Sequence, residues 1–176
     1  RESLPELLPL PGAEAEAVRV AGLYPKANLL LGPQATKEKF LGEAGKNEII
    51  HFAGHALANN PPDFSALIFS PGPKEQGEQD RGKLFAYQLK AVRFPQTRIV
   101  VLAGCRTGQV SRWRGDGVAG LVSPLLAAGV PAVVTALWDV DDFAALLISV
   151  RLHQKLREGA SASEALRLAQ LEMITH

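Results

Sequence analysis

The sequence predicts an α/β fold of three layers, with helices flanking a mostly parallel central sheet. Short apolar runs alternate with helix-forming segments, which is typical of parallel strands joined by helical crossovers. A length of 176 residues suits one well-buried core, so we expect a single domain over residues 1–176. The 19 basic and 18 acidic residues leave a net charge of +1 and are dispersed. This distribution argues against a nucleic-acid partner, because nucleic-acid-binding domains concentrate basic residues.

The first half of the chain predicts two helices and two strands, after a loop over Arg1–Gly12. Thr36 suits the N-cap of the second helix, with Phe40 and Leu41 facing inward. The strands are short apolar runs bounded by turn-forming residues. The predicted elements are helices at Glu14–Ala21 and from Thr36 to about Ala44, and strands at Glu48–Ala53 and Ala66–Phe69.

The second half predicts a regular alternation of strands and helices. Residues 117–138 carry no charge, which would suit a membrane span, but Pro124, Gly129 and Pro131 divide them into a helix, a turn and a strand. Ser161 and Glu164 form a capping box for the last helix. The predicted elements are helical turns at Leu84–Leu89, strands at Arg98–Ala103 and Ala132–Leu137, and helices at Val118–Ala128, from Asp141 to about Arg157, and after Ser161.

The chain's single cysteine, Cys105, follows the strand at Arg98–Ala103. In parallel sheets, ligand-binding and catalytic groups gather at the carboxyl ends of the strands, so this thiol is positioned to react. The alternative role is a small buried apolar residue. One cysteine forms no internal disulfide and the chain shows no signal peptide, so we expect a reducing, cytoplasmic location.

Two histidines lie four residues apart, at His51 and His55. On a helix this spacing would suit two metal ligands, but Ile49–Ala53 predicts a strand and the glutamate of the zinc-helix motif is missing. We therefore expect no metal and no cofactor. His51 suits the core of the sheet, whereas His55 follows the strand and emerges at the same edge as Cys105.

His55 and Cys105 together suit nucleophilic catalysis. A thiol is mostly protonated at neutral pH, and an adjacent imidazole can take its proton and later protonate a leaving amine. The backbone N–H groups of Ala56 and Cys105 suit an oxyanion hole, with Gly54 and Gly104 leaving room for the backbone. We therefore predict a dyad formed by His55 and Cys105.

A second motif, Gly115–Gly120, matches the dinucleotide fingerprint G-x-G-x-x-G, with Asp139 where a ribose-binding acid would lie. The fingerprint requires its first glycine to follow a strand directly, but the strand here ends near Ala103. We therefore interpret these glycines as a loop followed by close helix packing.

Several segments together resemble the CHAT domain, a caspase-like family related to separases and commonly fused to tetratricopeptide repeats. The resemblance runs from about Leu10 to Leu171 and includes the segments His51–Ala56, Val100–Gly108, Gly115–Leu121 and Ala128–Asp142. It implies a caspase-like fold and a cysteine endopeptidase, with His55 as the catalytic histidine and Cys105 as the nucleophile. Many relatives have glycine at the position of Ala56. The alanine of this chain keeps the N–H but restricts the backbone.

The resemblance also implies substrate contacts and partners. The segment Leu137–Asp142 is similar to the separase segment near the pocket for the residue before the scissile bond. Trp138, Asp139 and Asp142 are therefore expected to bind substrate, although Asp139 or Asp142 suits a helix N-terminus equally well. Asp139 or Asp141 is expected to cap the helix that follows.

The expected partners are a protein or peptide substrate and a regulatory tetratricopeptide-repeat domain, without nucleic acid or membrane. Because CHAT domains begin with an earlier strand, we expect this chain to be the C-terminal part of a longer protein. A non-catalytic interaction module with the same fold is the alternative function.

Overall fold

The computed structural model describes residues 10–59, 61–72, 81–103, 116–136 and 140–175. These residues form two compact units. The first, which we call the sheet unit, lies within Leu30–Asp139 and contains both β-sheets. The second, the helical unit, combines Leu10–Leu29 with Val140–His176. The expectation of one domain over the whole chain remains a prediction.

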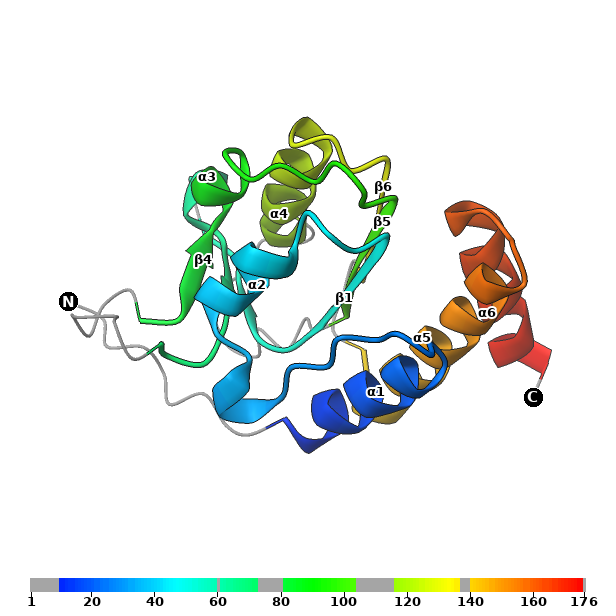
Figure 1. Ribbon diagram of the computed structural model, residues 1–176. Coiled ribbons are helices and arrows are strands. Elements are labelled where there is room, and N and C mark those ends of the chain that lie inside the picture. The colour runs from blue at the N-terminus through cyan, green and yellow to red at the C-terminus, as the bar shows by residue number, and fades with distance from the viewer. Residues whose placement is uncertain (1–9, 60, 73–80, 104–115, 137–139, 176) are drawn as a thin grey trace. The chain divides into compact units, whose positions relative to one another are not determined.

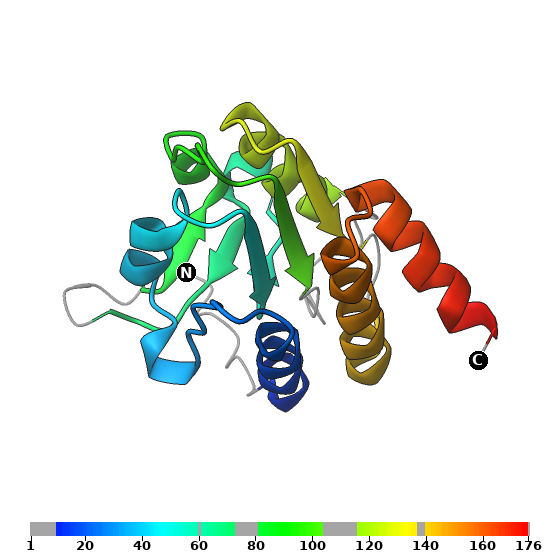
Figure 2. The same ribbon diagram turned by 45° about the vertical axis from the view of Figure 1, so that its right-hand side comes forward.

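The central element of the sheet unit is a three-stranded parallel sheet, seen as neighbouring arrows in Figures 1 and 2. It contains β1 (Ile49–Ala53), β5 (Ile99–Ala103) and β6 (Ala132–Thr135), with β5 in the middle. The first four residues of β5 are buried, as expected for a β-branched run covered on both faces. Together with its helices, this sheet confirms the predicted α/β class with a parallel central sheet.

A second sheet of three short antiparallel strands was not predicted. It contains β2 (Ala56–Leu57), β3 (Ala66–Ile68) and β4 (Lys83–Phe85), in the order β2-β3-β4. The prediction of a helical turn at Leu84 was wrong, because the helix α3 (Ala86–Leu89) begins two residues later. Leu84 instead pairs across the sheet with Leu67, and both side chains are fully buried. This non-local pairing outweighs the local helical preference.

The core of the sheet unit lies between one face of the parallel sheet, the second sheet and the helices α2 (Lys37–Glu43), α3 and α4 (Asp116–Ala127). Ile50 and Phe52 pack against it from β1. Its buried members are Ala44, Ala56, Leu67, Leu84, Ala86, Leu89, Phe94, Val100, Leu102, Leu121, Leu125, Ala128 and Val130. The even-numbered residues of β1 and β5 therefore share the face that meets this core.

The helix α2 confirms two predictions and contradicts a third. The hydroxyl of Thr36 accepts a hydrogen bond of 3.3 Å from the backbone N–H of Lys39, as expected for an N-cap. Phe40 packs against the core as predicted. Leu41 is 38% exposed, so its inward placement was wrong. Adjacent helix positions point about 100° apart, so a helix this short turns only one of them to the core.

The uncharged segment forms α4, a turn and β6, which confirms its prediction as a helix and a strand. Gly120 of α4 is buried, and a Cβ there would lie 2.8 Å from the Ser65 hydroxyl and 3.0 Å from the Pro62 carbonyl oxygen. Because β5 ends at Ala103 and α4 begins at Asp116, the glycine motif does not follow its strand directly. Close packing at Gly120 matches the structural interpretation of the motif.

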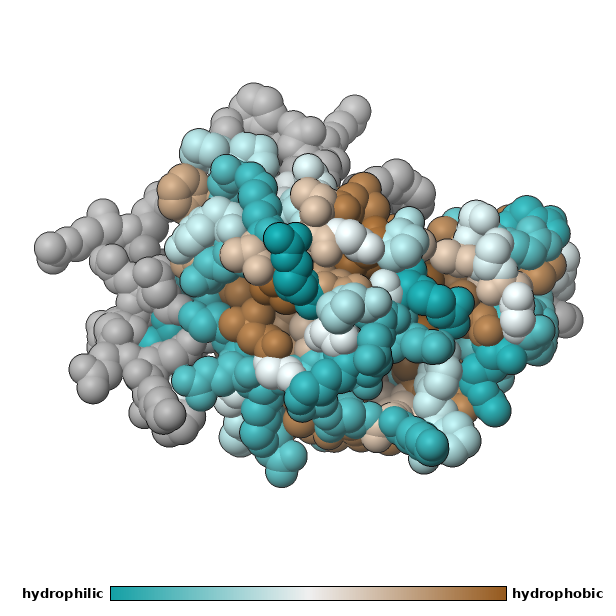
Figure 3. Space-filling view, turned by 45° about the horizontal axis from the view of Figure 1, so that its top comes forward, coloured by the Kyte–Doolittle hydropathy of each residue, from teal (hydrophilic) through white to brown (hydrophobic). Residues whose placement is uncertain are grey.

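The surface carries mostly hydrophilic side chains on the face in Figure 3, with smaller hydrophobic patches between them. This agrees with charges that are dispersed along the sequence. In the part of the chain that the structure describes, no helix combines the length and the apolar character that a membrane span needs.

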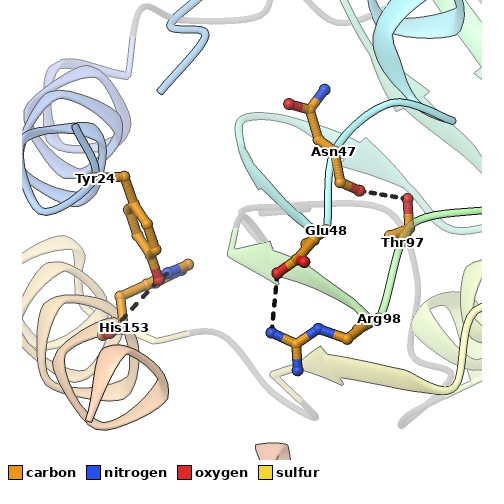
Figure 4. Close-up of polar contacts among 6 residues, drawn as sticks. All are labelled: Tyr24, Asn47, Glu48, Thr97, Arg98 and His153. Carbon is orange, nitrogen blue, oxygen red and sulfur yellow. Dashed lines mark hydrogen bonds and ion pairs between the residues drawn. The ribbon is translucent and has the colours of Figure 1, made fainter. Parts of the chain in front are cut away.

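Polar contacts align the beginnings of β1 and β5 (Figure 4). The buried hydroxyl of Thr97 lies 2.8 Å from the carbonyl oxygen of Asn47 and 2.9 Å from that of Ala44. Beside it, Arg98 and Glu48 form an exposed ion pair at 3.2 Å. The buried contacts contribute more than the ion pair, which water screens. They fix the register in which β1 and β5 run toward their carboxyl ends.

The helical unit contains α1 (Pro11–Gly22), α5 (Asp142–Arg157) and α6 (Ala162–Thr175). α1 begins earlier than the predicted Glu14, because proline is well suited to the first helical position. The cap of α5 is Asp141, whose carboxylate accepts hydrogen bonds from the backbone N–H groups of Phe143 (3.0 Å) and Ala144 (3.2 Å). This confirms one of the two predicted caps.

Polar and charged contacts stabilise α6 and connect it to α5. Ser161 accepts a 3.3 Å hydrogen bond from the backbone N–H of Glu164, as the capping box predicts. The Glu164 carboxylate binds Arg167, and this hydrogen bond lowers the pKa of Glu164. Glu172 of α6 contacts Lys155 of α5 at 3.1 Å, and the hydrogen bonds that the Lys155 ammonium donates to Glu172 and Glu158 raise the pKa of Lys155.

A buried histidine joins α1's end to α5. The Nδ1 atom of His153, a fully buried residue, lies 2.8 Å from the hydroxyl of Tyr24, and the two rings meet edge to face (Figure 4). Tyr24→Phe removes this hydroxyl, and we expect it to lower the free energy of unfolding by about 1–2 kcal/mol, because the buried Nδ1 atom of His153 loses this hydrogen-bond partner. Urea denaturation followed by circular dichroism measures the change.

The matched control is Tyr87→Phe, because the Tyr87 side chain is 46% exposed and stacks on Phe85 through its ring. We expect it to change stability by less than about 0.5 kcal/mol. Equal stabilities for the two variants would contradict a role of the Tyr24 hydroxyl in holding α1 on α5.

Candidate functional site

The candidate site begins where β1 ends. His51 lies inside β1, opposite Val101 of β5, and His55 lies two residues beyond the last strand residue, Ala53. The predicted strand over Ile49–Ala53 is thus confirmed, and the two histidines do not share a helix face. Among the described residues, no group of three or more histidine, cysteine, aspartate or glutamate side chains has the arrangement of a metal site.

An aromatic row supports the turn that carries His55. The ring of Phe52 lies so close to Gly54 that a Cβ at Gly54 would come within 3.0 Å of the ring's Cζ atom. Behind Phe52, the ring of Phe69 lies 5.2 Å away, and that of Phe40 lies 5.0 Å beyond Phe69. Phe52 points toward the core because it alternates with His51 along β1. The row therefore connects α2 and the second sheet to the backbone just before His55.

The backbone of His55 is held at the junction of the two sheets. Its carbonyl oxygen accepts a 2.9 Å hydrogen bond from the backbone N–H of Ile68 in β3. The His55 side chain is partly buried, and its Nδ1 atom is buried. Two contacts therefore fix the position of the His55 backbone. Phe52 packs against Gly54, the residue before it, and β3 binds its carbonyl oxygen.

Ala56, the first residue of β2, turns its backbone N–H away from β3. Hydrogen-bonded and non-hydrogen-bonded pairs alternate along an antiparallel ladder. The bond between Ile68 and His55 makes the next pair, Ala56 with Leu67, a non-hydrogen-bonded one. The N–H and C=O of Ala56 therefore point to the outer side of β2, away from β3.

The structure brings two of the predicted site residues, His55 and Ala56, together at one strand end. Cys105, Trp138 and Asp139 lie outside the described residues. Asp142 is the first residue of α5, in the helical unit, and is not its cap. A Cβ on Gly12 of α1 would lie 2.7 Å from the Cβ of Asp142, so α1 packs closely against this residue.

Sequence reasoning missed two residues that position His55. Phe52 had a signal, because an aromatic residue two positions before a glycine can cover that glycine's bare backbone. Ile68 had none, because its hydrogen bond to His55 depends on the pairing of β2 with β3.

Comparison with known proteins places these residues in a family context. A sequence model of the CHAT domain matches residues 3–176. The chain is similar to tetratricopeptide repeat protein 28 of Mus musculus, with 27% identity over 191 residues that include 90% of this chain and 8% of that protein. The Homo sapiens protein of the same name is 27% identical over 187 residues, which include 90% of this chain and 7% of that protein. The chain therefore spans less than a tenth of these relatives' length.

Proposed function

This chain belongs to the CHAT domain family, which is caspase-like, and from that premise we propose that it is a cysteine endopeptidase with a dyad of His55 and Cys105. The observation that carries the proposal is the register of the parallel sheet. Ala53, the last residue of β1, lies opposite Ala103, the last residue of β5. His55 and Cys105 each follow these paired residues by two positions. This equal spacing supports their meeting at the same edge of the sheet.

The proposed reaction uses His55 first as a base and then as an acid. His55 accepts the proton of the Cys105 thiol, and the thiolate sulfur attacks the carbonyl carbon of the scissile peptide bond. The resulting oxyanion accepts hydrogen bonds from the N–H groups of Ala56 and Cys105. His55 then protonates the leaving amine, and water hydrolyses the thioester with His55 again as the base. These steps require no cofactor.

We propose that Trp138, Asp139 and Asp142 contact the substrate residue before the scissile bond. Two carboxylates favour a basic side chain there, because opposite charges attract over short distances.

We further propose that a tetratricopeptide-repeat domain regulates this activity. The support is the name of the two relatives, whose length far exceeds the part that matches this chain. The single cysteine supports a reducing, cytoplasmic setting for the thiol.

The function is tested with a peptide library and a thiol-reactive peptide probe. We expect the native chain to cleave a subset of peptides, enriched in a basic residue before the cut, and Cys105→Ala to cleave none. Because the chain has one cysteine, covalent labelling identifies Cys105 without mapping, and mass spectrometry should show one probe per chain. An unlabelled, inactive chain that still binds a protein partner after Cys105→Ala would contradict the proposal and favour an interaction module.

A further inference from the structure

The strand β2 is the outer strand of the second sheet, and on its side away from β3 it pairs with no other strand among the described residues. The sheet order is β2-β3-β4, so β2 is an edge strand among the described residues. Ala56 points its N–H and C=O outward, as the pairing of Ala56 with Leu67 requires. Outward backbone groups at a sheet edge can pair with another extended chain.

The same outward direction recurs at Ala58. The next residue, Asn59, faces the β3 side, because its backbone N–H bonds to the Ser65 hydroxyl at 3.1 Å and its side-chain amide bonds to the Phe64 carbonyl at 2.7 Å. Backbone groups alternate in direction along an extended chain, so Ala58 points outward like Ala56. The two sets of outward groups are about 7 Å apart, which is the repeat of every second residue in a strand.

We propose that this outer edge, formed by Ala56 and Ala58, binds the part of the substrate that follows the scissile bond as an added strand. The inference rests on the proposed function. Since His55 protonates the leaving nitrogen, the departing segment begins beside His55, and β2 is the chain that directly follows His55.

The backbone groups at this edge divide their roles. The N–H of Ala56 serves the oxyanion, while the C=O of Ala56 and the N–H of Ala58 bond to the departing peptide. Main-chain hydrogen bonds of this kind give affinity without reading side chains. The expected substrate is therefore an extended, unstructured segment with little sequence preference after the cut.

The test compares Ala58→Pro with the native chain on two substrates. One is the best peptide from the library, with three residues after the scissile bond, and the other replaces them with a coumarin amide. Proline removes the outward N–H of Ala58 while its fixed φ suits an extended chain. We expect KM for the peptide to rise about 3- to 10-fold, the loss of one hydrogen bond, with kcat/KM for the coumarin amide unchanged. The matched control is Ala162→Pro at the first position of α6, where proline is well tolerated, and neither substrate should be affected.

A binding measurement decides the question without turnover. The tetrapeptide amide Ala-Val-Thr-Val-NH2 is titrated into the Cys105→Ala chain, and the amide NMR signals of Ala56 and Ala58 are followed. We expect shifts at both residues, and a smaller shift of the Ala56 signal when Ala58→Pro is added, a variant that has no amide signal of its own at position 58. No shift at Ala58, or equal effects of Ala58→Pro on both substrates, would overturn the inference. A chain that binds the tetrapeptide but cleaves no peptide would contradict the proposed activity and leave the binding edge supported.

Discussion

Replacing His55 by alanine is expected to lower kcat/KM for peptide hydrolysis by about 10²–10⁴-fold, the usual contribution of general acid–base catalysis. The imidazole is proposed to act in both halves of the reaction, so its loss affects thioester formation and breakdown. The variant should still fold, because β3 binds the backbone carbonyl of His55 and alanine keeps that group. Steady-state kinetics with the best library peptide measure the change.

The control for this variant is His51→Gln, which alters the neighbouring histidine inside β1. A further readout is the rate of Cys105 alkylation as a function of pH. An ordinary thiol has a pKa near 8.5, so the pH midpoint of alkylation should move up toward that value in His55→Ala and stay in place in His51→Gln. Equal alkylation profiles for native chain and His55→Ala would show that His55 does not activate Cys105.

Replacing Gly82 by alanine is expected to lower the free energy of unfolding by about 3 kcal/mol. Gly82 has a φ of 72°, which disfavours any residue with a Cβ, and the added atom would lie 2.1 Å from the Phe69 carbonyl oxygen. That oxygen belongs to the backbone and cannot turn aside as a flexible side chain would. The N–H of Phe69 also bonds to the Gly82 carbonyl at 2.7 Å, so relief of the clash breaks this pair.

Gly42→Ala is the matched control, because a Cβ at Gly42 in α2 would meet no atom within 4 Å. Alanine favours a helix over glycine, so this variant should be more stable by up to about 1 kcal/mol. Thermal and urea unfolding measure both variants. Since Phe69 supports Phe52 at the turn before His55, Gly82→Ala should also reduce probe labelling of Cys105. A native-like stability for Gly82→Ala would contradict the close approach of Gly82 to Phe69.

The parallel sheet and most helix boundaries could be predicted because local signals and tertiary structure agree there. The apolar, mostly β-branched run Ile99–Ala103 favours a buried strand, and Asp141 and Ser161 mark helix starts through hydrogen bonds within a few residues. Such contacts are visible in the sequence, because the partners are close along the chain.

The second sheet could not be predicted for the opposite reason. β2 has two residues and β4 has three, which is too short for an alternating pattern, and their pairing depends on a β3 strand about ten or more residues away along the sequence. Leu84 shows the result, since a residue with a good helix propensity lies in a strand because Leu67 is opposite it.

The candidate site divides in the same way. His55 could be placed at a strand end from the apolar run before it, and the structure agrees. Its hydrogen bond with Ile68 and the outward N–H of Ala56 follow from β2–β3 pairing, which the sequence does not reveal. The roles of Cys105, Trp138, Asp139 and Asp142 remain predictions, with the family membership as their basis.

The contact between Tyr24 and His153 also has a consequence for the order of folding. The two residues are 129 positions apart, and α1 packs against α5 across the whole sequence of the sheet unit. During synthesis, α1 emerges long before α5, so its inward Val20 lacks this neighbour until α5 has been made. Closing so long a loop carries an entropic cost and slows folding. The helical unit should therefore assemble after the sheet unit, which leaves α1 accessible to chaperones until α5 has emerged from the ribosome.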